Sequence, residues 1–201
     1  MGSFDDISFD ENEAVEEVSY FDSFAESDQL DKQKFEIRDW MLKHTSQLSD
    51  KKVPVDIIIN DDLRIDTISD CIITSAITEL PDNIKFKVAL HNFACVKKSL
   101  TSLKNFPDIV EGSFHCNNTS IKDLQGGPMS VKGNYFISNI KTLVSLKGAP
   151  KIVGMRFVCV NCPNLKEDLD KLPQATEYVC PEIKNMMTDE DWKHITGDLT
   201  E

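Results

Sequence analysis

The residues best suited to chemistry are a pair of cysteines and a histidine next to a third cysteine. Cys159 and Cys162 form a C-x-x-C pair, a spacing that can hold half of a zinc site or a redox-active disulfide. A zinc site needs two further ligands, and the chain has no second C-x-x-C. His115 directly precedes Cys116, which raises the possibility of a thiol nucleophile with its general base.

Both possibilities weaken once the neighbouring sequence is considered. Cys116, Cys159 and Cys180 fall at one position of a repeat, which favours a role as small core hydrophobes. If this position lies in a strand, alternation sends His115 and Cys116 to opposite faces. The other histidines are isolated, and no nucleophile elbow, phosphate-binding loop, dinucleotide fingerprint or zinc-protease motif occurs. The sequence therefore predicts no enzyme, no metal site and no cofactor.

The elements that must position these residues are three copies of one segment, beginning at Leu103, Leu124 and Leu146. The copies are 21 and 22 residues apart, and such a period predicts a solenoid. The one-residue difference falls in the loop after Asn118. The aligned positions are Pro107, Pro128 and Pro150; Val110, Val131 and Val153; Phe114, Tyr135 and Phe157; Cys116, Ile137 and Cys159; and Asn118, Asn139 and Asn161.

Alternation within each predicted strand separates buried from exposed positions. Phe114 and Cys116 are expected inside, so the residues between and beside them point outward. Outward side chains of stacked strands form one sheet face, and exposed apolar groups among polar ones are typical of a binding patch. A covering C-terminal segment or a neighbouring subunit is the alternative explanation. The predicted partner-binding residues are Ser113, His115, Asn117, Asn134, Phe136, Ser138, Arg156, Val158 and Val160.

Turn residues frame each predicted strand. An asparagine follows the predicted strand in each copy, where its side chain can satisfy backbone groups in a sharp turn. Glycine precedes each strand and recurs in the return segment, where it permits bends without steric cost. The glycines concerned are Gly112, Gly133 and Gly154, with Gly126, Gly127 and Gly148 in the return segments.

These residues resemble the leucine-rich-repeat family, in the variant reading L-x-G-A-P-x-x-V-x-G-x-F-x-C-x-x-N-x-L that is associated mainly with large tailed bacteriophages. The resemblance covers residues 103–165 well and 53–180 loosely. It implies a curved solenoid with parallel strands on the concave face, a protein-recognition role and no catalysis. Asn105 and Phe106 depart from the Gly-Ala of the motif, and Met155 departs from its glycine spacing.

The remaining segments are predicted to be a tail and two caps. Residues 1–28 are expected to be a disordered acidic tail, 29–50 an N-terminal capping helix, 53–180 the solenoid and 181–201 a C-terminal cap. The capping helix should have an apolar face, although a helix of a separate small domain is an alternative. Its apolar residues are Leu30, Phe35, Ile37, Trp40, Met41 and Leu48.

The register of the first repeats is ambiguous. From Val53 to Ile59 alternate apolar residues predict a strand. One register then aligns the proline at Pro81 with Pro107, and a rival aligns Phe93 with Phe114. The first register rests on the spacing of Leu80, Pro81, Ile84, Val88, Leu90 and Asn92.

The C-terminal end repeats the pattern imperfectly and then changes to helix. Tyr178 and Cys180, preceded by Leu172 and Pro173, resemble a last copy of the repeat. Residues 188–191 read Thr-Asp-Glu-Asp, which predicts a capped helix that carries Trp192 and Ile195 and stops at Gly197.

Charge is concentrated at the N-terminus. The net charge of −12 comes almost entirely from eleven acidic side chains in residues 1–31, which leave 23 acidic and 22 basic groups in the remainder. The sequence shows neither a secretory signal nor a membrane span, so the expectation is a soluble cytoplasmic chain, in the host cytoplasm if it is phage-encoded. A neutral body with an acidic tail argues against direct nucleic-acid binding.

These observations favour a non-enzymatic interaction protein with a protein partner, from the host or the phage. The strand face would be one contact and the tail a second. An alternative is a decoy, whose acidic segment imitates nucleic acid and occupies a nuclease, polymerase or defence protein; another is a virion structural component. A solubilising end is the simpler explanation of the tail. The predicted tail contacts are Phe4, Phe9, Tyr20, Phe21 and Phe24.

Overall fold

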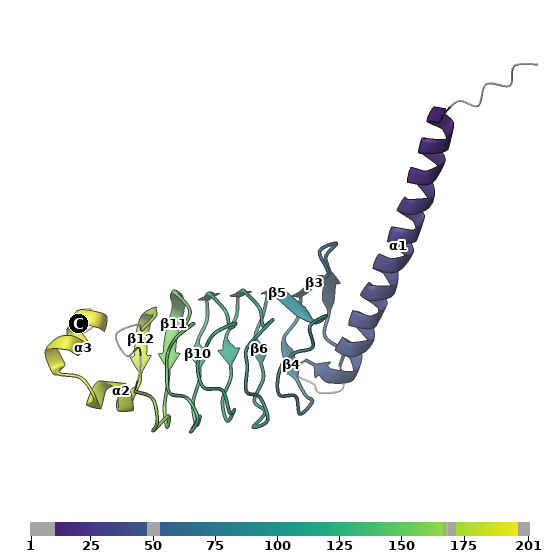
Figure 1. Cartoon of the computed structure of the whole chain (residues 1–201). Coiled ribbons are helices and arrows are strands. Elements are labelled where there is room, and N and C mark those ends of the chain that lie inside the picture. The colour runs from purple at the N-terminus through teal and green to yellow at the C-terminus, as the bar shows by residue number, and fades with distance from the viewer. Residues whose placement is uncertain (1–10, 48–52, 167, 169–171, 197–201) are drawn as a thin grey trace, which may run out of the picture.

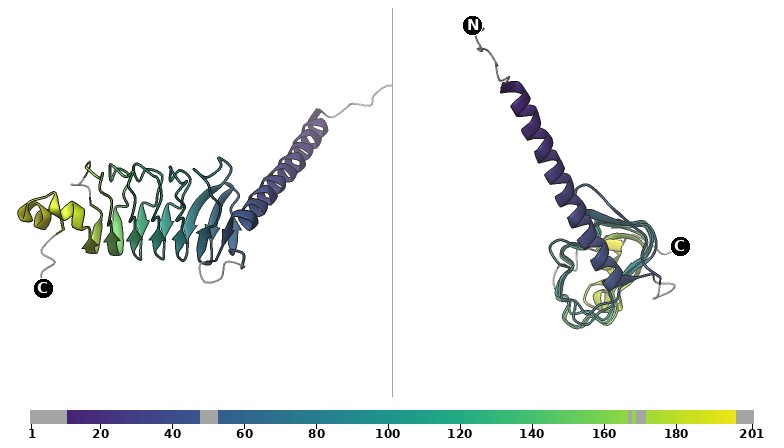
Figure 2. Two further views of the ribbon diagram at one scale, coloured as in Figure 1. Left: turned by 90° about the horizontal axis from the view of Figure 1, so that it is seen from below. Right: turned by 90° about the vertical axis from the view of Figure 1, so that its right-hand side faces the viewer.

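The chain forms a β-solenoid of about five turns with mostly parallel strands. The computed structural model describes residues 11–47, 53–166, 168 and 172–196. Figure 1 shows the coils side by side in a row, with helix α1 (Glu11–His44) leaving one end and helices α2 (Pro181–Asn185) and α3 (Asp189–Thr196) at the other. Viewed along the row, the coils superimpose on one outline (Figure 2). The predicted solenoid is thus confirmed.

Most coils contribute two short strands rather than the single strand expected, and the last two coils contribute one longer strand each, so two parallel ladders run along the molecule. Ladder A contains the predicted strands, and its members pair in register at Phe93, Phe114, Tyr135 and Phe157. An antiparallel strand, β1 (Thr45–Ser46), borders it at the N-terminal end. Ladder A consists of β4 (Cys71–Ile73), β6 (Phe93–Ala94), β8 (Phe114–His115), β10 (Tyr135–Phe136) and the last residues of β11 (Ile152–Val158) and β12 (Gln174–Val179).

Ladder B was not predicted as a set of strands. It brings the repeat valines into register, with Val110 beside Val131 and Val131 beside Val153. Its antiparallel border strand, β2 (Ile57–Ile59), forms part of the strand expected from Val53 onward. Ladder B consists of β2, β3 (Arg64–Thr67), β5 (Lys85–Ala89), β7 (Ile109–Val110), β9 (Ser130–Val131) and the first residues of β11 and β12.

The core is a column of aromatic rings beside a column of small hydrophobes. Phe114 stacks on Tyr135 with ring centroids 5.1 Å apart, and Tyr135 stacks on Phe157 at 5.7 Å. The next inward position holds Cys116, Ile137 and Cys159, and all of these residues are buried. Identical spacing along the chain therefore becomes identical packing along the row.

The asparagines lie in turns as predicted, where the Asn161 side chain donates to that of Asn139 at 2.8 Å, and the glycines serve two purposes. Asn118, Asn139 and Asn161 adopt the left-handed conformation, with φ of 59°, 60° and 61°, which asparagine tolerates better than most residues. Gly148 also has positive φ, at +87°. Gly154, in contrast, is needed for close approach, because a Cβ there would lie 2.1 Å from the carbonyl oxygen of Lys132 in the adjacent coil.

The structure resolves the register of the first repeats in favour of the rival alignment. Phe93 pairs with Phe114 in ladder A, so the register built on Pro81 is wrong. The proline match was coincidental, because Pro81 is exposed whereas Pro107 is buried. The buried aromatic residue indicated the register better than the proline did, because Phe93 stacks on Phe114 and continues the column of rings.

Helix α1 starts earlier and ends earlier than predicted. It begins at Glu11, within the expected tail, and ends at His44 because the chain enters β1, which pairs with β4. Ile37 and Met41 are buried in the solenoid core. Phe35, expected on the same face, is 68% exposed. Leu48 and residues 1–10 lie outside the described residues.

The C-terminal end follows the prediction closely. Phe157 pairs with Tyr178, so β12 is a further copy of the repeat. The Thr188 hydroxyl accepts a hydrogen bond from the Asp191 backbone N–H at 3.1 Å, which is the N-cap half of a capping box, and donates one to the Asp191 carboxylate at 2.6 Å. Trp192 packs edge-on against Tyr178 with centroids 6.1 Å apart.

Two tyrosines at equivalent positions should respond oppositely to loss of the hydroxyl group. The Tyr135 hydroxyl is buried without a hydrogen-bond partner among the described residues, whereas the Tyr178 hydroxyl accepts from the Ala175 N–H and donates to the Pro173 carbonyl. We expect Tyr135→Phe to raise the free energy of unfolding by about 1 kcal/mol and Tyr178→Phe to lower it by about 1 kcal/mol. Urea denaturation measures both. Equal effects of the two changes would contradict this assignment.

Candidate functional site

The cysteines are placed as packing residues. All six are buried free thiols. Burial raises the pKa of Cys95 to about 11 and that of Cys180 to about 12, and it raises the pKa of Cys116 further. Such thiols are protonated near neutral pH and are weak nucleophiles.

The C-x-x-C pair lies inside the coil. Cys159 and Cys162 occupy the positions of Ile137 and Ile140 in the preceding coil, and all four side chains are buried. A hydrogen bond with Cys162, followed by burial, raises the pKa of Cys159. The Cys162 thiol donates to the Ile137 carbonyl at 3.2 Å. Within the described parts of the chain, no three His, Cys, Asp or Glu residues gather where a metal could bind.

The histidine and cysteine of the possible dyad lie on opposite sides of the sheet, as alternation predicts. Cys116 is fully buried beside Thr119, with 3.7 Å between sulfur and hydroxyl oxygen. His115 is half-buried on the outer face of ladder A. Its ring stacks on that of Phe136 with centroids 4.6 Å apart and planes 19° from parallel. His115 therefore packs against Phe136 on the outer face, and it does not form a catalytic pair with Cys116.

The outer face of ladder A carries one mostly apolar line of side chains, here called the central row. Its members are brought into line by strand register: Ala94 beside His115, His115 beside Phe136, and Phe136 beside Val158. Three of the nine predicted contact residues, His115, Phe136 and Val158, belong to it. The complete central row is Ile72, Ala94, His115, Phe136, Val158 and Val179.

A first polar series, Ser113, Asn134 and Arg156, borders the central row at the corner between the two ladders. Its side chains make hydrogen bonds to the neighbouring coils. The Ser113 hydroxyl accepts from the Asn134 backbone N–H at 3.0 Å. The Asn134 side-chain oxygen in turn accepts from the Arg156 N–H at 3.3 Å. The Arg156 guanidinium pairs with Glu177 at 2.7 Å. Thus, Ser113 and Asn134, predicted as contact residues, bond one coil to the next.

A second polar series lies on the other side of the central row. The Asn117 side-chain oxygen accepts from the Ser138 N–H at 2.7 Å, and the Ser138 hydroxyl accepts from the Val160 N–H at 3.3 Å. Asn117 and Ser138 are therefore also engaged between coils. The three predicted contacts in the central row differ from these, because Phe136 and Val158 have apolar side chains and the His115 ring stacks on Phe136.

The structure gives less information on the predicted tail contacts. Tyr20, Phe21 and Phe24 belong to helix α1. Phe4 and Phe9 lie outside the described residues. Figure 1 shows that the N-terminal part of α1 extends away from the row of coils, so the part of the predicted tail that lies in α1 is separate from the strand face.

Sequence reasoning missed the outer face of ladder B, because the residues before the repeat valines were not assigned to a strand. Ile58, Ile109 and Ile152 point outward there and are 50%, 37% and 52% exposed. The available signal was an apolar residue immediately before the aligned valine, as in Ile109-Val110 and Ile152-Val153. A residue pair of this kind indicates one inward and one outward side chain.

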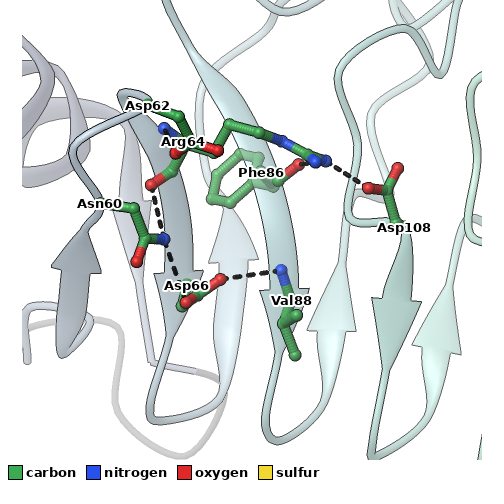
Figure 3. Close-up of polar contacts among 7 residues, drawn as sticks. All are labelled: Asn60, Asp62, Arg64, Asp66, Phe86, Val88 and Asp108. Atoms are coloured by element: carbon green, nitrogen blue, oxygen red, sulfur yellow. Dashed lines mark hydrogen bonds and ion pairs between the residues drawn. The ribbon is translucent and has the colours of Figure 1, made fainter.

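A hydrogen-bond network fixes the first coils of ladder B (Figure 3). Strand β5 is bulged opposite the junction of Ile65 and Asp66, and the Asp66 carboxylate accepts from the Val88 N–H at 3.1 Å. Arg64 donates to the Phe86 carbonyl at 3.0 Å and pairs with Asp108 two coils away. These side chains bond to backbone groups on either side of the bulge, so their role is structural.

A cavity of about 380 Å³ lies between α1 and the first coils. Its lining includes Ile37 and Leu63 together with the acidic residues Glu36, Asp62 and Asp82. It is separate from the central row, and the lining residues hold no metal-ligand group of the kind sought above.

Comparison of the chain with protein-family models, with curated proteins and with solved structures finds no match. Among the described residues, no helix has the length and apolar character required to cross a bilayer. The class defined by the fold and the candidate site is a β-solenoid with a mostly apolar, partly buried row on its outer face, between two hydrogen-bonded polar series.

Ser113 provides a test of the structural role of the first polar series. Ser113→Ala removes the acceptor of the Asn134 N–H, so we expect the free energy of unfolding to fall by about 1 kcal/mol. Urea denaturation gives the value. Ser130→Ala, at an outward position of ladder B, is the control and should change stability less. Unchanged stability of Ser113→Ala would refute the assignment.

His115 should make stability depend on pH. Burial lowers its pKa from the ordinary 6.5, and the nearby Asp70 carboxylate opposes part of the shift. The unfolded chain then binds the proton more readily, so this contribution to stability is complete above pH 6.5 and is lost as pH falls through the folded pKa. We expect His115→Gln to flatten the stability profile below pH 6.5.

Urea denaturation between pH 5 and pH 8 of wild type, His115→Gln and His91→Gln measures this dependence, over the range in which histidine titrates. His91 is exposed, and its substitution serves as the control. Parallel profiles for wild type and His115→Gln would show that the pKa of His115 is not lowered in the folded protein.

Proposed function

We propose that this protein is a non-enzymatic protein-interaction module that binds a protein partner through the central row. The observation that carries the proposal is the Phe136 ring, which lies half-buried on the outer face between His115 and Val158. Aromatic residues in the middle of a desolvated patch contribute most to binding energy. The row takes part in coil-to-coil hydrogen bonding only through its backbone, as where the Phe136 carbonyl accepts from the Cys116 N–H.

The polar series on either side support the same function. They hold the strands in register, and their side chains remain partly accessible at the border of the central row. An apolar centre with a polar rim is the usual composition of a recognition surface. Arg156, which is exposed at this border, is the charged residue best placed to choose between partners.

We also propose that the coils are divergent leucine-rich repeats of the bacteriophage type, and that the partner is a host or phage protein met in the cytoplasm. The support is the sequence from Leu146 to Val153, which reads L-K-G-A-P-K-I-V, and the burial of its Leu146, Pro150 and Val153. Helix α1, through Ile37 and Met41, and helix α2, through buried Ile183, are proposed as the caps of the two ends.

The acidic N-terminal segment is proposed as a second contact. Its eleven acidic groups within residues 1–31 would attract a basic surface at long range, and such attraction raises association rates and weakens with salt. The decoy hypothesis uses the same charges, but it requires the segment to suffice for binding. A virion structural role requires the protein to be present in purified particles.

Proximity labelling in the native cell tests the proposal. Phe136→Ala should reduce recovery of the partner about tenfold or more, as expected for a central aromatic contact. Ile152→Ala, a similarly apolar residue on the outer face of ladder B, is the control and should retain the partner. Circular dichroism and urea denaturation should confirm that both variants are folded.

The outcome also separates the alternatives. Full recovery with Phe136→Ala together with complete loss on deletion of residues 1–31, at an affinity that falls steeply with salt, would replace the proposal by the decoy. Recovery that survives both changes would exclude both surfaces.

A further inference from the structure

One edge of strand β2 pairs with no other described strand. In its antiparallel pairing with β3, the Ile68 N–H donates to the Asp56 carbonyl at 2.8 Å and the Asn60 N–H donates to the Arg64 carbonyl at 3.0 Å. Hydrogen-bonded positions alternate along an antiparallel pair. Therefore, Asp56, Ile58 and Asn60 face β3, whereas the N–H and C=O groups of Ile57 and Ile59 face away from it.

These outward groups lie at the end of the sheet. Strand β2 is the last member of the strand order, and no described residue hydrogen-bonds to the backbone of Ile57 or Ile59 across that edge. The opposite end of ladder B differs, because the Tyr178 hydroxyl bonds the Ala175 N–H and the Pro173 carbonyl. An exposed edge of this kind is a template for a further strand.

The side chains of β2 suit such pairing. Ile59 is buried, and Ile57 packs against the same core from a partly buried position. Ile58 points outward and is 50% exposed. Three isoleucines in sequence, with the exposed one in the middle, make the edge symmetric about Ile58.

We propose that a second copy of this chain adds to β2 in antiparallel orientation, with a two-fold axis at Ile58. Ile57 of each copy then lies opposite Ile59 of the other, and each of these two pairs exchanges both backbone hydrogen bonds. The two Ile58 side chains meet between them. The register also places Asp56 opposite Asn60, so no two carboxylates oppose each other across the axis.

This self-complementarity favours a second copy over an unrelated peptide as the occupant. The charge distribution sets the strength. Each copy carries eleven acidic groups in residues 1–31 on the segment that leads into this end, and their mutual repulsion opposes association until salt screens it. The dimer is therefore expected to be weak and to strengthen as ionic strength rises.

Disulfide trapping tests the register. Opposed residues at a non-hydrogen-bonded antiparallel position have Cα atoms about 4.5 Å apart, within the range of a disulfide. Ile58→Cys should therefore form a covalent homodimer under mild oxidation. The six native cysteines are buried, so background cross-linking should be low.

Leu90→Cys is the matched control, because Leu90 is 45% exposed but follows β5 in the interior of the row. It should cross-link much less than Ile58→Cys. Equal cross-linking of the two variants would indicate random collision and overturn the proposal.

A backbone change tests the hydrogen bonds independently. Ile57→Pro removes an N–H that makes no bond to another described residue, so the monomer should remain folded by circular dichroism. The dimer loses two donors across the axis, and dimerisation measured by sedimentation should weaken about tenfold or more. Ile57→Val retains the N–H and should behave as wild type.

Wild type that stays monomeric at high concentration and high salt, or a dimer unaffected by Ile57→Pro, would overturn the proposal. Protection of the Ile57 and Ile59 amides from hydrogen exchange only on addition of a different protein would assign this edge to that protein instead.

Discussion

The structure depends on register-locked hydrogen bonding between successive coils. The Cys116 N–H donates to the Phe136 carbonyl at 2.8 Å, and the Ile137 N–H donates to the Val158 carbonyl at 3.0 Å. Each strand therefore lies at a fixed level relative to its neighbour, and residues of equal rank form columns. Inside, the columns are aromatic rings and small hydrophobes. Outside, they are rows, and a row is the unit that a partner can recognise.

The same constraint decides which outward residues remain available. Where the chain turns between ladder B and ladder A, backbone N–H groups need acceptors, and Ser113 and Asn134 supply them. Through these hydrogen bonds Ser113 and Asn134 hold neighbouring coils in register beside the central row. His115, Phe136 and Val158 lie farther from the turns, where the backbone bonds are complete without them. Phe136 and Val158 carry no hydrogen-bonding group in their side chains, and the His115 ring stacks on Phe136.

A stack of identical units leaves two unfinished ends, and the ends of this molecule are finished differently. At the C-terminal end Tyr178 folds its hydroxyl back onto the last strand and Trp192 packs on its ring. At the N-terminal end Ile37 and Met41 of α1 are buried in the core, while no described strand pairs with the outer edge of β2. Apolar burial and edge protection are separate requirements, and the burial of Ile37 and Met41 bears on the first.

The sequence by itself determined the repeat, its inward and outward positions and its asparagine turns, because these follow from local periodicity that every coil shares. It also indicated that the cysteines are core residues, since Ile137 replaces one of them. Only the tertiary structure decided the second strand of each coil, the pairing of Phe93 with Phe114 and the early start of α1. It also divided the nine predicted contacts into a central row and two structural series. The reason is that a side-chain oxygen becomes a bridge only when the next coil, 21 or 22 residues later, presents its N–H at hydrogen-bond distance, here 2.7 to 3.3 Å, and no local pattern contains that distance.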